Sequence, residues 1–173
     1  MRKLILGLAV SLDGFIEGPN GEYDWCYTDQ DYGMSEFFKR VDALFIGRRS
    51  YELFAATEGE VASWMPKMKE YVFSNTLKEV KEGATLIAGD FEPAVKDIKS
   101  SEGKDIWLFG GASLTSSLMN AGLVDEFWLS VHPILLGEGK PLFSNISGRI
   151  QLGLLESKTY DTGLVQVKYA VKR

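Results

Sequence analysis

Hydrophobic positions in the first 120 residues fall into short apolar runs that alternate with segments of helical spacing. Apolar runs of this length, bounded by polar residues, are typical of buried strands. The runs that predict strands are residues 3–10, 43–47, 70–74, 85–88 and 105–109. Helices are predicted over residues 34–41, 49–56 and 112–121, the last of which Gly122 is expected to end. A fourth helix is expected to begin with Asp90 as its cap and to have Phe91, Val95 and Ile98 on one face.

The last fifty residues change to strict alternation. Phe127, Leu129 and Val131 alternate with polar or amphipathic neighbours, and a second alternating run covers residues 165–171. This pattern predicts half-exposed strands, and residues 161–163 between two such runs predict a hairpin turn. Together the two parts predict an α/β fold in which a mixed, mostly parallel sheet has helices on both faces and an antiparallel hairpin at its end.

Composition narrows the class of protein. The chain has 173 residues, 45% of them hydrophobic and 25% charged, which predicts one domain over residues 1–173. A net charge of -5 argues against a nucleic-acid partner. The apolar start is too short for a membrane span and has no cleavage pattern, so we expect no membrane partner and a cytoplasmic protein. Exposed strand edges near the C-terminus favour a homodimer, with Trp128 as a candidate contact.

The supply of metal-binding and nucleophilic side chains is small. Cys26 is the only cysteine and His132 the only histidine. One cysteine cannot form an internal disulfide, and one residue of each kind cannot make a zinc site. We therefore expect no bound metal and no cysteine nucleophile.

Two strand-to-helix junctions carry the strongest chemical signal. In the first, WLFGGASL at residues 107–114, a buried strand runs through Gly110 and Gly111 into an uncharged helix. The first turn of a helix has unpaired N–H groups and the positive end of the dipole, so it favours an anion, and glycines let a ligand approach the main chain. A plain tight turn would have the same pattern.

The second junction, residues 43–52, ends its strand at Gly47 and continues with Arg48, Arg49 and Ser50. Positive charge in a first turn opposes the helix dipole, and arginine matches the geometry of a phosphate. Two such junctions in a small α/β protein predict a ligand with several phosphates.

These motifs, taken in order, resemble the dihydrofolate reductase superfamily over nearly the whole chain. Residues 8–16 look like its first strand and mobile active-site loop, and residues 47–52 like its cofactor turn. Residues 73–75 fall where the family contacts the adenosine end, and residues 109–114 resemble its Gly-Gly turn. Segments 11–16, 122–126 and 133–143 look most like one branch, the reductase domain of bacterial riboflavin-pathway deaminase-reductases and its stand-alone relatives.

The resemblance implies a three-layer fold that binds NADPH and transfers hydride to a small-molecule substrate. The cofactor-binding residues implied are Ala9, Ile16, Gly47, Arg48, Arg49, Ser50, Ser74, Asn75, Gly110, Gly111, Ala112, Ser113 and Leu114. Candidates to orient the substrate or relay a proton are Asp13, Asp29, Asp31 and Glu126. Folate reductases place a carboxylate five residues after a tryptophan, where this chain has Gln30 after Trp25, flanked by two of these aspartates.

The substrate class stays open between related acceptors. The nearest resemblance implies a reductase similar to 5-amino-6-(5-phosphoribosylamino)uracil reductase of riboflavin biosynthesis. The alternatives are a dihydrofolate reductase and a nucleotide-binding protein that has kept the fold without the chemistry.

Overall fold

The computed structural model describes residues 1–57 and 64–173. Its elements follow the predicted order, with ends within one or two residues of the predicted ones. They are β1 (Leu4–Ser11), β2 (Phe15–Glu17), α1 (Met34–Arg40), β3 (Val41–Gly47), α2 (Arg48–Ala56), β4 (Lys69–Phe73), β5 (Thr85–Ile87), α4 (Glu92–Ser100), β6 (Asp105–Gly110), α5 (Ala112–Asn120), β7 (Glu126–His132), β8 (Lys140–Pro141), β9 (Leu152–Thr159) and β10 (Val165–Val171).

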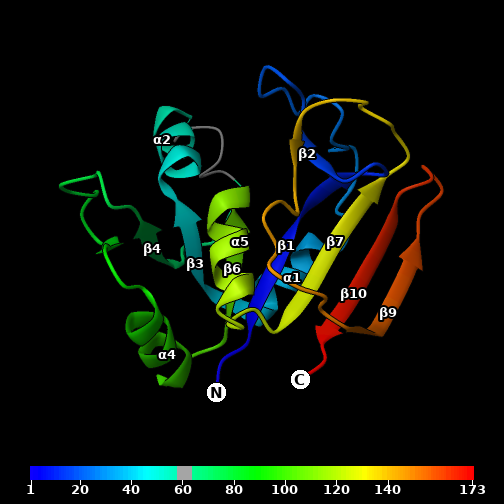
Figure 1. The fold of residues 1–173 in the computed structure, drawn as a ribbon. Helices are drawn as coiled ribbons and strands as arrows, with labels where there is room; N and C mark the ends of the chain where they lie inside the picture. The colour runs from blue at the N-terminus through cyan, green and yellow to red at the C-terminus, as the bar shows by residue number, and fades with distance from the viewer. Residues whose placement is uncertain (58–63) are drawn as a thin grey trace.

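The described strands form an eight-stranded sheet in the order β5-β4-β3-β6-β1-β7-β10-β9 (Figure 1). The first six strands in this order, β5, β4, β3, β6, β1 and β7, are parallel to one another. Strand β10 is antiparallel to both β7 and β9. The predicted mixed, mostly parallel sheet with a C-terminal hairpin is confirmed. Because parallel strands end at the same edge, the ends of β3, β4, β6, β1 and β7 meet at the top of Figure 1, opposite both chain termini.

Helices cover both faces of the sheet, as predicted. One core cluster contains Val95 of α4 and Leu118 of α5, which pack with Leu4 and Leu108. The other contains Phe37 of α1 and receives side chains of α2. These two clusters account for the near-continuous apolar runs of the central strands, since both sides of each strand are covered.

Two short strands were not predicted. Strand β2 lies in the segment that resembles the mobile active-site loop, and β8 lies where no element was predicted. The two strands pair antiparallel as a separate two-stranded sheet, with Glu17 opposite Lys140. Runs of two and three residues are too short to give a periodic signal. The Gly14 carbonyl accepts the N–H of Leu142 at 2.9 Å, which fixes this small sheet to the end of β1.

Two further expectations are corrected. Helix α4 has Phe91 rather than Asp90 at its N-cap, although the Asp90 carboxylate accepts the N–H of Glu92 at 3.1 Å. Trp128 is 5% exposed and belongs to the core, with the Lys168 ammonium 3.5 Å above its ring centre, so it is not a surface contact. Helix α1 covers this face of β7, and Phe37 packs against Trp128, which simple alternation along β7 does not reveal.

Among the described residues, no helix is long and apolar enough to cross a membrane.

Candidate functional site

The two predicted anion-binding junctions meet at the carboxyl edge of the sheet. Strands β3 and β6 are neighbours, and each runs directly into a helix, at Gly47 and at Gly111. A Cβ placed on Gly47 would lie 3.6 Å from the Gly110 carbonyl oxygen and 3.6 Å from the Gly111 nitrogen. The structure therefore brings the two glycine turns into contact.

The absence of a side chain at Gly111 leaves room for one methyl group, and we call this space the gap at Gly111. A Cβ built there would lie 3.5 Å from the Ser50 hydroxyl oxygen and 3.9 Å from the Lys140 ammonium. Ser50 belongs to the first turn of α2, and Lys140 comes from β8. Lys140 was not among the predicted site residues, because only the pairing of β8 with β2 brings it to the Gly-Gly turn.

The first turns of both helices are open to an anion. Neither α2 nor α5 has a side-chain cap or an acidic residue in its first turn. Unpaired N–H groups and the helix dipoles thus combine at one place. Ala112, Ser113 and Leu114 supply the first turn of α5, as the sequence indicated.

The two arginines of α2 differ in their partners. Arg48 is paired with Glu52 one turn along the helix at 3.1 Å. Arg49 makes no ion pair within the part of the chain that the structure describes. Its guanidinium is thus the more available of the two for a phosphate.

Ser74 and Asn75 follow β4 at the same edge, and both hold the local turn. The Ser74 hydroxyl oxygen accepts the N–H groups of Thr76 and Leu77 at 3.1 and 3.0 Å. The Asn75 side-chain oxygen accepts the N–H of Gly89 at 2.7 Å. The Ser74 and Thr76 hydroxyl oxygens also lie 3.3 Å apart, within hydrogen-bond distance. The Asn75 amide donors remain for a ligand.

Asp13 organises the loops that follow β1 and β7. Its carboxylate accepts the Ser11 hydroxyl at 2.7 Å and the Gly137 N–H at 2.8 Å. These hydrogen bonds, the one from Ser11 first, hold the pKa of Asp13 below its usual value. The contacts give the carboxylate a positioning task at the site's margin.

Ala9 and Ile16 lie on either side of that turn. Ala9 is in β1 opposite Ser130 of β7, and Ile16 is in β2, where it packs against the core cluster of α4 and α5. Both are near the carboxyl end of β1, where the resemblance places the nicotinamide.

Aromatic side chains surround His132 at the end of β7. The rings of Trp25 and Tyr27 lie 5.3 and 5.0 Å from the imidazole, edge-on. The backbone N–H of Tyr27 donates to Nε2 at 3.1 Å, so Nε2 carries no proton and Nδ1 donates to the Ser130 carbonyl. Burial lowers the pKa of His132, which favours this neutral form. No pattern in the sequence predicted this cluster, because Trp25 and Tyr27 are far from His132 along the chain.

Three buried polar atoms have no hydrogen-bond partner among the described residues: Trp25 Nε1, Thr115 Oγ1 and Tyr160 OH. Such atoms are rare in folded proteins and commonly mark a place for a ligand or water. Thr115 lies in the first half of α5, and its Oγ1 is 4.0 Å from the Cβ position of Gly110. An unused hydroxyl thus adjoins the Gly-Gly turn.

Asp29 and Asp31 lie on the segment before α1, beside the hairpin turn between β9 and β10. Asp29 accepts the Tyr32 hydroxyl at 2.7 Å. Asp31 accepts the hydroxyl and the N–H of Ser35, and the hydroxyl bond first of all holds its pKa below the usual value. Both carboxylates are therefore already engaged in local hydrogen bonds.

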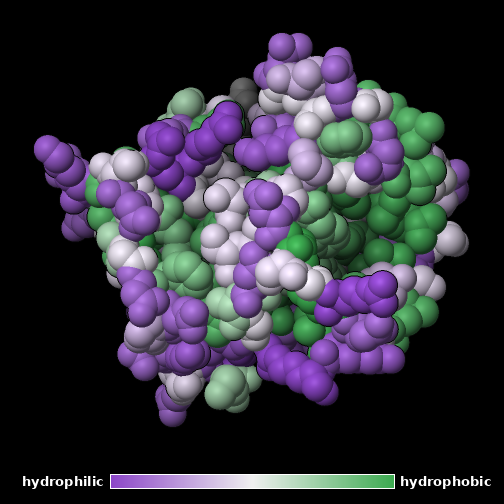
Figure 2. Space-filling model, in the orientation of Figure 1, coloured by the Kyte–Doolittle hydropathy of each residue, from purple (hydrophilic) through white to green (hydrophobic). Residues whose placement is uncertain are grey.

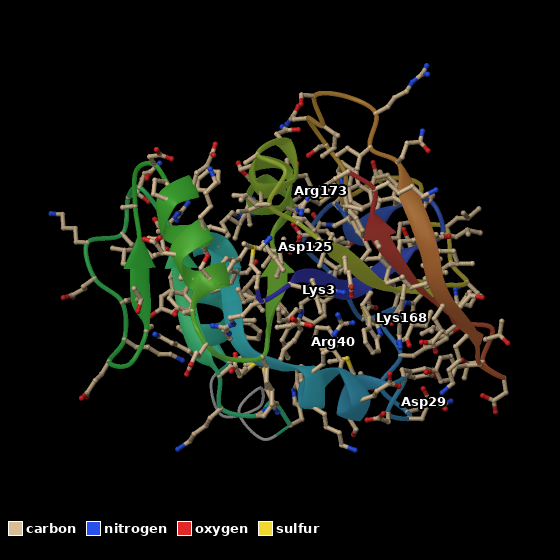
Figure 3. All side chains as sticks on the ribbon, turned by 90° about the horizontal axis from the view of Figure 1, so that it is seen from below. Lys3, Asp29, Arg40, Asp125, Lys168 and Arg173 are labelled. Carbon is tan, nitrogen blue, oxygen red and sulfur yellow. The ribbon has the colours of Figure 1, made fainter. Side chains whose placement is uncertain are left out.

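Glu126 does not join the other predicted residues. It begins β7, at the opposite edge of the sheet, and its side chain is 5% exposed. Lys3 and Arg40 hold its carboxylate at 2.5 and 2.6 Å, and Figure 3 shows these two cations on the underside of the molecule. We therefore leave Glu126 out of the proposed site.

The described residues give little support for a cysteine nucleophile or a metal site. Burial, with a further contribution from Asp24, raises the pKa of the Cys26 thiol to about 11, which keeps it protonated and poorly nucleophilic. Among residues 1–57 and 64–173, no group of three or more histidine, cysteine or carboxylate side chains is arranged to hold a metal. A hollow of about 440 Å³ bordered by Arg40, Glu156 and Lys168 lies between α1 and the C-terminal hairpin, away from the glycine turns.

A dinucleotide fits the residues that the carboxyl edge presents. Ser50 of the arginine turn and Lys140 border the gap at Gly111, and the unpaired Thr115 hydroxyl adjoins the neighbouring Gly110. Main-chain N–H groups, two hydroxyls and cations are the donors that phosphates require.

Similar bacterial proteins match nearly the whole chain. The chain is 45% identical to the uncharacterized protein YyaP of Bacillus subtilis over 97% of this chain and 94% of that one. A Shewanella sp. PV-4 structure, named provisionally for riboflavin biosynthesis, matches with 27% identity and a TM-score of 0.86 over all of both chains.

More distant structures share the fold. The Thermotoga maritima diaminohydroxyphosphoribosylaminopyrimidine deaminase/5-amino-6-(5-phosphoribosylamino)uracil reductase matches at 14% identity and a TM-score of 0.73, over 99% of this chain and 57% of that one. Dihydrofolate reductase from Enterococcus faecalis, solved with NADP(H) and RAB-propyl, matches at 16% identity and a TM-score of 0.65, over 99% and 97% of the two chains. The predicted dihydrofolate reductase-like fold is confirmed.

The family model for the RibD C-terminal domain matches residues 2–166. The chain therefore belongs to the RibD C-terminal domain family.

Proposed function

We propose that this protein is an NADPH-dependent reductase that transfers hydride to a small heterocyclic or ribosylamino-pyrimidine substrate. The observation that carries the proposal is the gap at Gly111, where two helix starts, the Ser50 hydroxyl and the Lys140 ammonium converge. Family membership supports a reductase, because the family model is that of the RibD reductase-type domain.

Each part of the cofactor has its own residues in this proposal. Arg49, with Arg48 and Ser74, binds the 2′-phosphate of the adenosine end. Gly47, Ser50, Gly110 and the first turn of α5 receive the diphosphate through N–H and O–H donors. Asn75 contacts the adenosine, while Ala9 and Ile16 flank the nicotinamide. When bound, the cofactor supplies a hydride from its nicotinamide C4.

The substrate lies beside the nicotinamide, toward the aromatic group around His132. Trp25 and Tyr27 form apolar walls there, and Trp25 Nε1 offers an unused donor. A flat heterocycle with carbonyl acceptors suits this setting. Asp29 and Asp31 are the nearby carboxylates that orient it, and the neutral His132 holds the wall in place.

The pyrimidine is favoured over dihydrofolate as the acceptor. At the position five residues after Trp25, where folate reductases have their pterin-binding carboxylate, this chain has Gln30. The Thermotoga protein of the same fold is named as a 5-amino-6-(5-phosphoribosylamino)uracil reductase.

The direct test follows NADPH absorbance at 340 nm with each candidate acceptor. We expect oxidation with 5-amino-6-(5-phosphoribosylamino)uracil or a close pyrimidine analogue, and much slower oxidation with dihydrofolate. Saturable NADPH binding without oxidation of any acceptor would favour the nucleotide-binding protein without chemistry. Faster oxidation with dihydrofolate would favour the folate reductase.

We also propose a homodimer that forms through the β9 edge. Leu152, Leu154 and Leu155 of β9 are exposed, and Figure 2 shows apolar side chains gathered on the β7–β10–β9 side of the molecule. An uncovered apolar edge strand favours pairing with a second copy. Light scattering after gel filtration should give twice the 19.3 kDa chain mass, and Leu154→Lys should shift it to the monomer. A monomeric wild-type protein would contradict this.

A further inference from the structure

We infer that Lys140 is a diphosphate-binding residue, and that its pairing with Glu17 couples cofactor binding to β2, the short strand that carries Ile16. This inference rests on the proposed function. Nothing in the glycine or arginine motifs includes Lys140, which belongs to the separate sheet of β2 and β8.

The position of the ammonium is the first observation. Lys140 Nζ lies 3.9 Å from the Cβ position of Gly111, and the Ser50 hydroxyl lies 3.5 Å from the same point. Three donors therefore surround one gap: the start of α5, a hydroxyl and an ammonium. A diphosphate is the part of a dinucleotide that needs such a set.

The incomplete pairing of this lysine is the second observation. Its carboxylate partner, Glu17, is 3.6 Å away, which is longer than the 2.7–2.9 Å typical of an ammonium–carboxylate hydrogen bond. The Lys140 side chain is partly buried, at 29% exposed. The ammonium thus retains the capacity to bind an anion.

The backbone around Lys140 is held firmly. Gly139 has φ +144, and a Cβ there would lie 2.2 Å from the Glu17 carbonyl oxygen, so the two strands are in close contact at this point. Glu17 lies opposite Lys140 in the strand pairing, and Ile16, the expected nicotinamide contact, is its neighbour. An anion that attracts Lys140 therefore acts on the same short strand that flanks the nicotinamide.

The test compares Lys140→Gln with Lys96→Gln. Lys96 forms an exposed pair with Glu92 at 3.2 Å on α4, so its variant makes the same charge change away from the site. Titration calorimetry is carried out with NADPH and with adenosine 2′-monophosphate, which lacks the diphosphate. We expect Lys140→Gln to weaken NADPH binding about ten-fold or more. Binding of adenosine 2′-monophosphate should stay within about two-fold, and Lys96→Gln should leave both unchanged.

Two further variants separate charge from structure. Lys140→Arg keeps the cation and should bind NADPH within about three-fold of the wild type, even if Lys140→Gln folds poorly. Glu17→Gln removes the competing carboxylate and should tighten NADPH binding. If Glu17→Gln weakens binding as much as Lys140→Gln, the ion pair matters only for structure and the inference is wrong.

The outcomes also distinguish the inference from the proposed function. If the wild type binds NADPH and Lys140→Gln binds it equally well, the inference fails and the reductase proposal stands. An equal loss of affinity for both ligands would likewise overturn the inference, because Lys140 would then act through the overall electrostatic potential and not through a contact with the diphosphate. If the wild type does not bind NADPH at all, both fail.

Discussion

A Cβ atom on Gly111 would lie 3.5 Å from the hydroxyl oxygen of Ser50, so the first turns of α5 and α2 face each other across a space that holds one methyl group. Both residues follow neighbouring parallel strands, β6 and β3, which end at the same edge. The geometry of the sheet therefore brings Ser50 and Gly111 together at the place where we propose that the cofactor's diphosphate binds.

Filling that space should affect the ligand more than the fold. Gly111 has φ -80, which any residue adopts, and the contacts of the added Cβ are of ordinary length. We expect Gly111→Ala to weaken NADPH binding at least about ten-fold, because a methyl group occupies the diphosphate position. Calorimetric titration checks this. Gly148→Ala, at a glycine with open space around it, is the matched control and should bind NADPH normally.

The arginines of α2 should contribute unequally to cofactor choice. Arg49 has no ion pair in the described residues, whereas Arg48 is held by Glu52. Arg49→Gln should weaken NADPH binding about ten-fold or more and leave NADH binding unchanged, because only NADPH has the 2′-phosphate. Arg48→Gln should have the smaller effect. The ratio of the two dissociation constants measures this, and equal losses for both cofactors would refute a 2′-phosphate role.

Glu126 should be a stability residue. Its buried carboxylate is held by Lys3 and Arg40, far from the glycine turns. Glu126→Gln should lower the free energy of unfolding by about 1–3 kcal/mol, because a charge-assisted pair is lost in a buried place. Urea denaturation measures the loss. NADPH binding should be unchanged, and a selective loss of turnover with normal stability would restore Glu126 as a catalytic candidate.

His132 should make stability depend on pH. Burial lowers its pKa in the folded protein below the ordinary value of about 6.5. As the pH falls through 6.5, the unfolded chain gains a proton that the folded protein does not, so the free energy of unfolding decreases. The decrease ends below the folded-state pKa, and above about pH 7.5 this contribution is constant.

The measurement for His132 is a series of urea denaturation curves between pH 5 and 8. His132→Gln removes the titrating group and should flatten the part of the slope between pH 5 and 6.5. Carboxylates such as Asp13 and Asp31 titrate lower and contribute equally to both proteins. An identical slope in the variant would show that His132 is not the group responsible.

The sequence allowed the sheet, the helices and both glycine turns to be predicted, because each has a local signal. The runs at β1, β3 and β6 are long and apolar, and glycines mark the ends of two of them, Gly47 for β3 and Gly110 for β6. Contacts between distant segments had no such signal. Lys140 reaches Gly111 only through the pairing of two very short strands, and Trp128 is buried only because α1 covers it.

The four candidate carboxylates also show that the sequence alone could not decide which residues share the site. Asp13, Asp29 and Asp31 come to the carboxyl edge with the loops that carry them, whereas Glu126 was grouped with them by residue type alone. Which end of β7 a residue occupies follows from the direction of the strand, and register with Ile5 places Glu126 at its beginning. Residue type predicts possible chemistry, but only the topology decides which side chains share a site.

Thermal unfolding of the purified protein without ligand, with NADPH and with NADH tests the central claim most directly. A ligand at one hundred times its dissociation constant stabilises by about 2.7 kcal/mol, which corresponds to about 5–10 °C in the unfolding midpoint at this length. We predict a shift of that size with NADPH and a clearly smaller one with NADH. No shift with either cofactor would contradict the assignment of the glycine and arginine turns as an NADPH site.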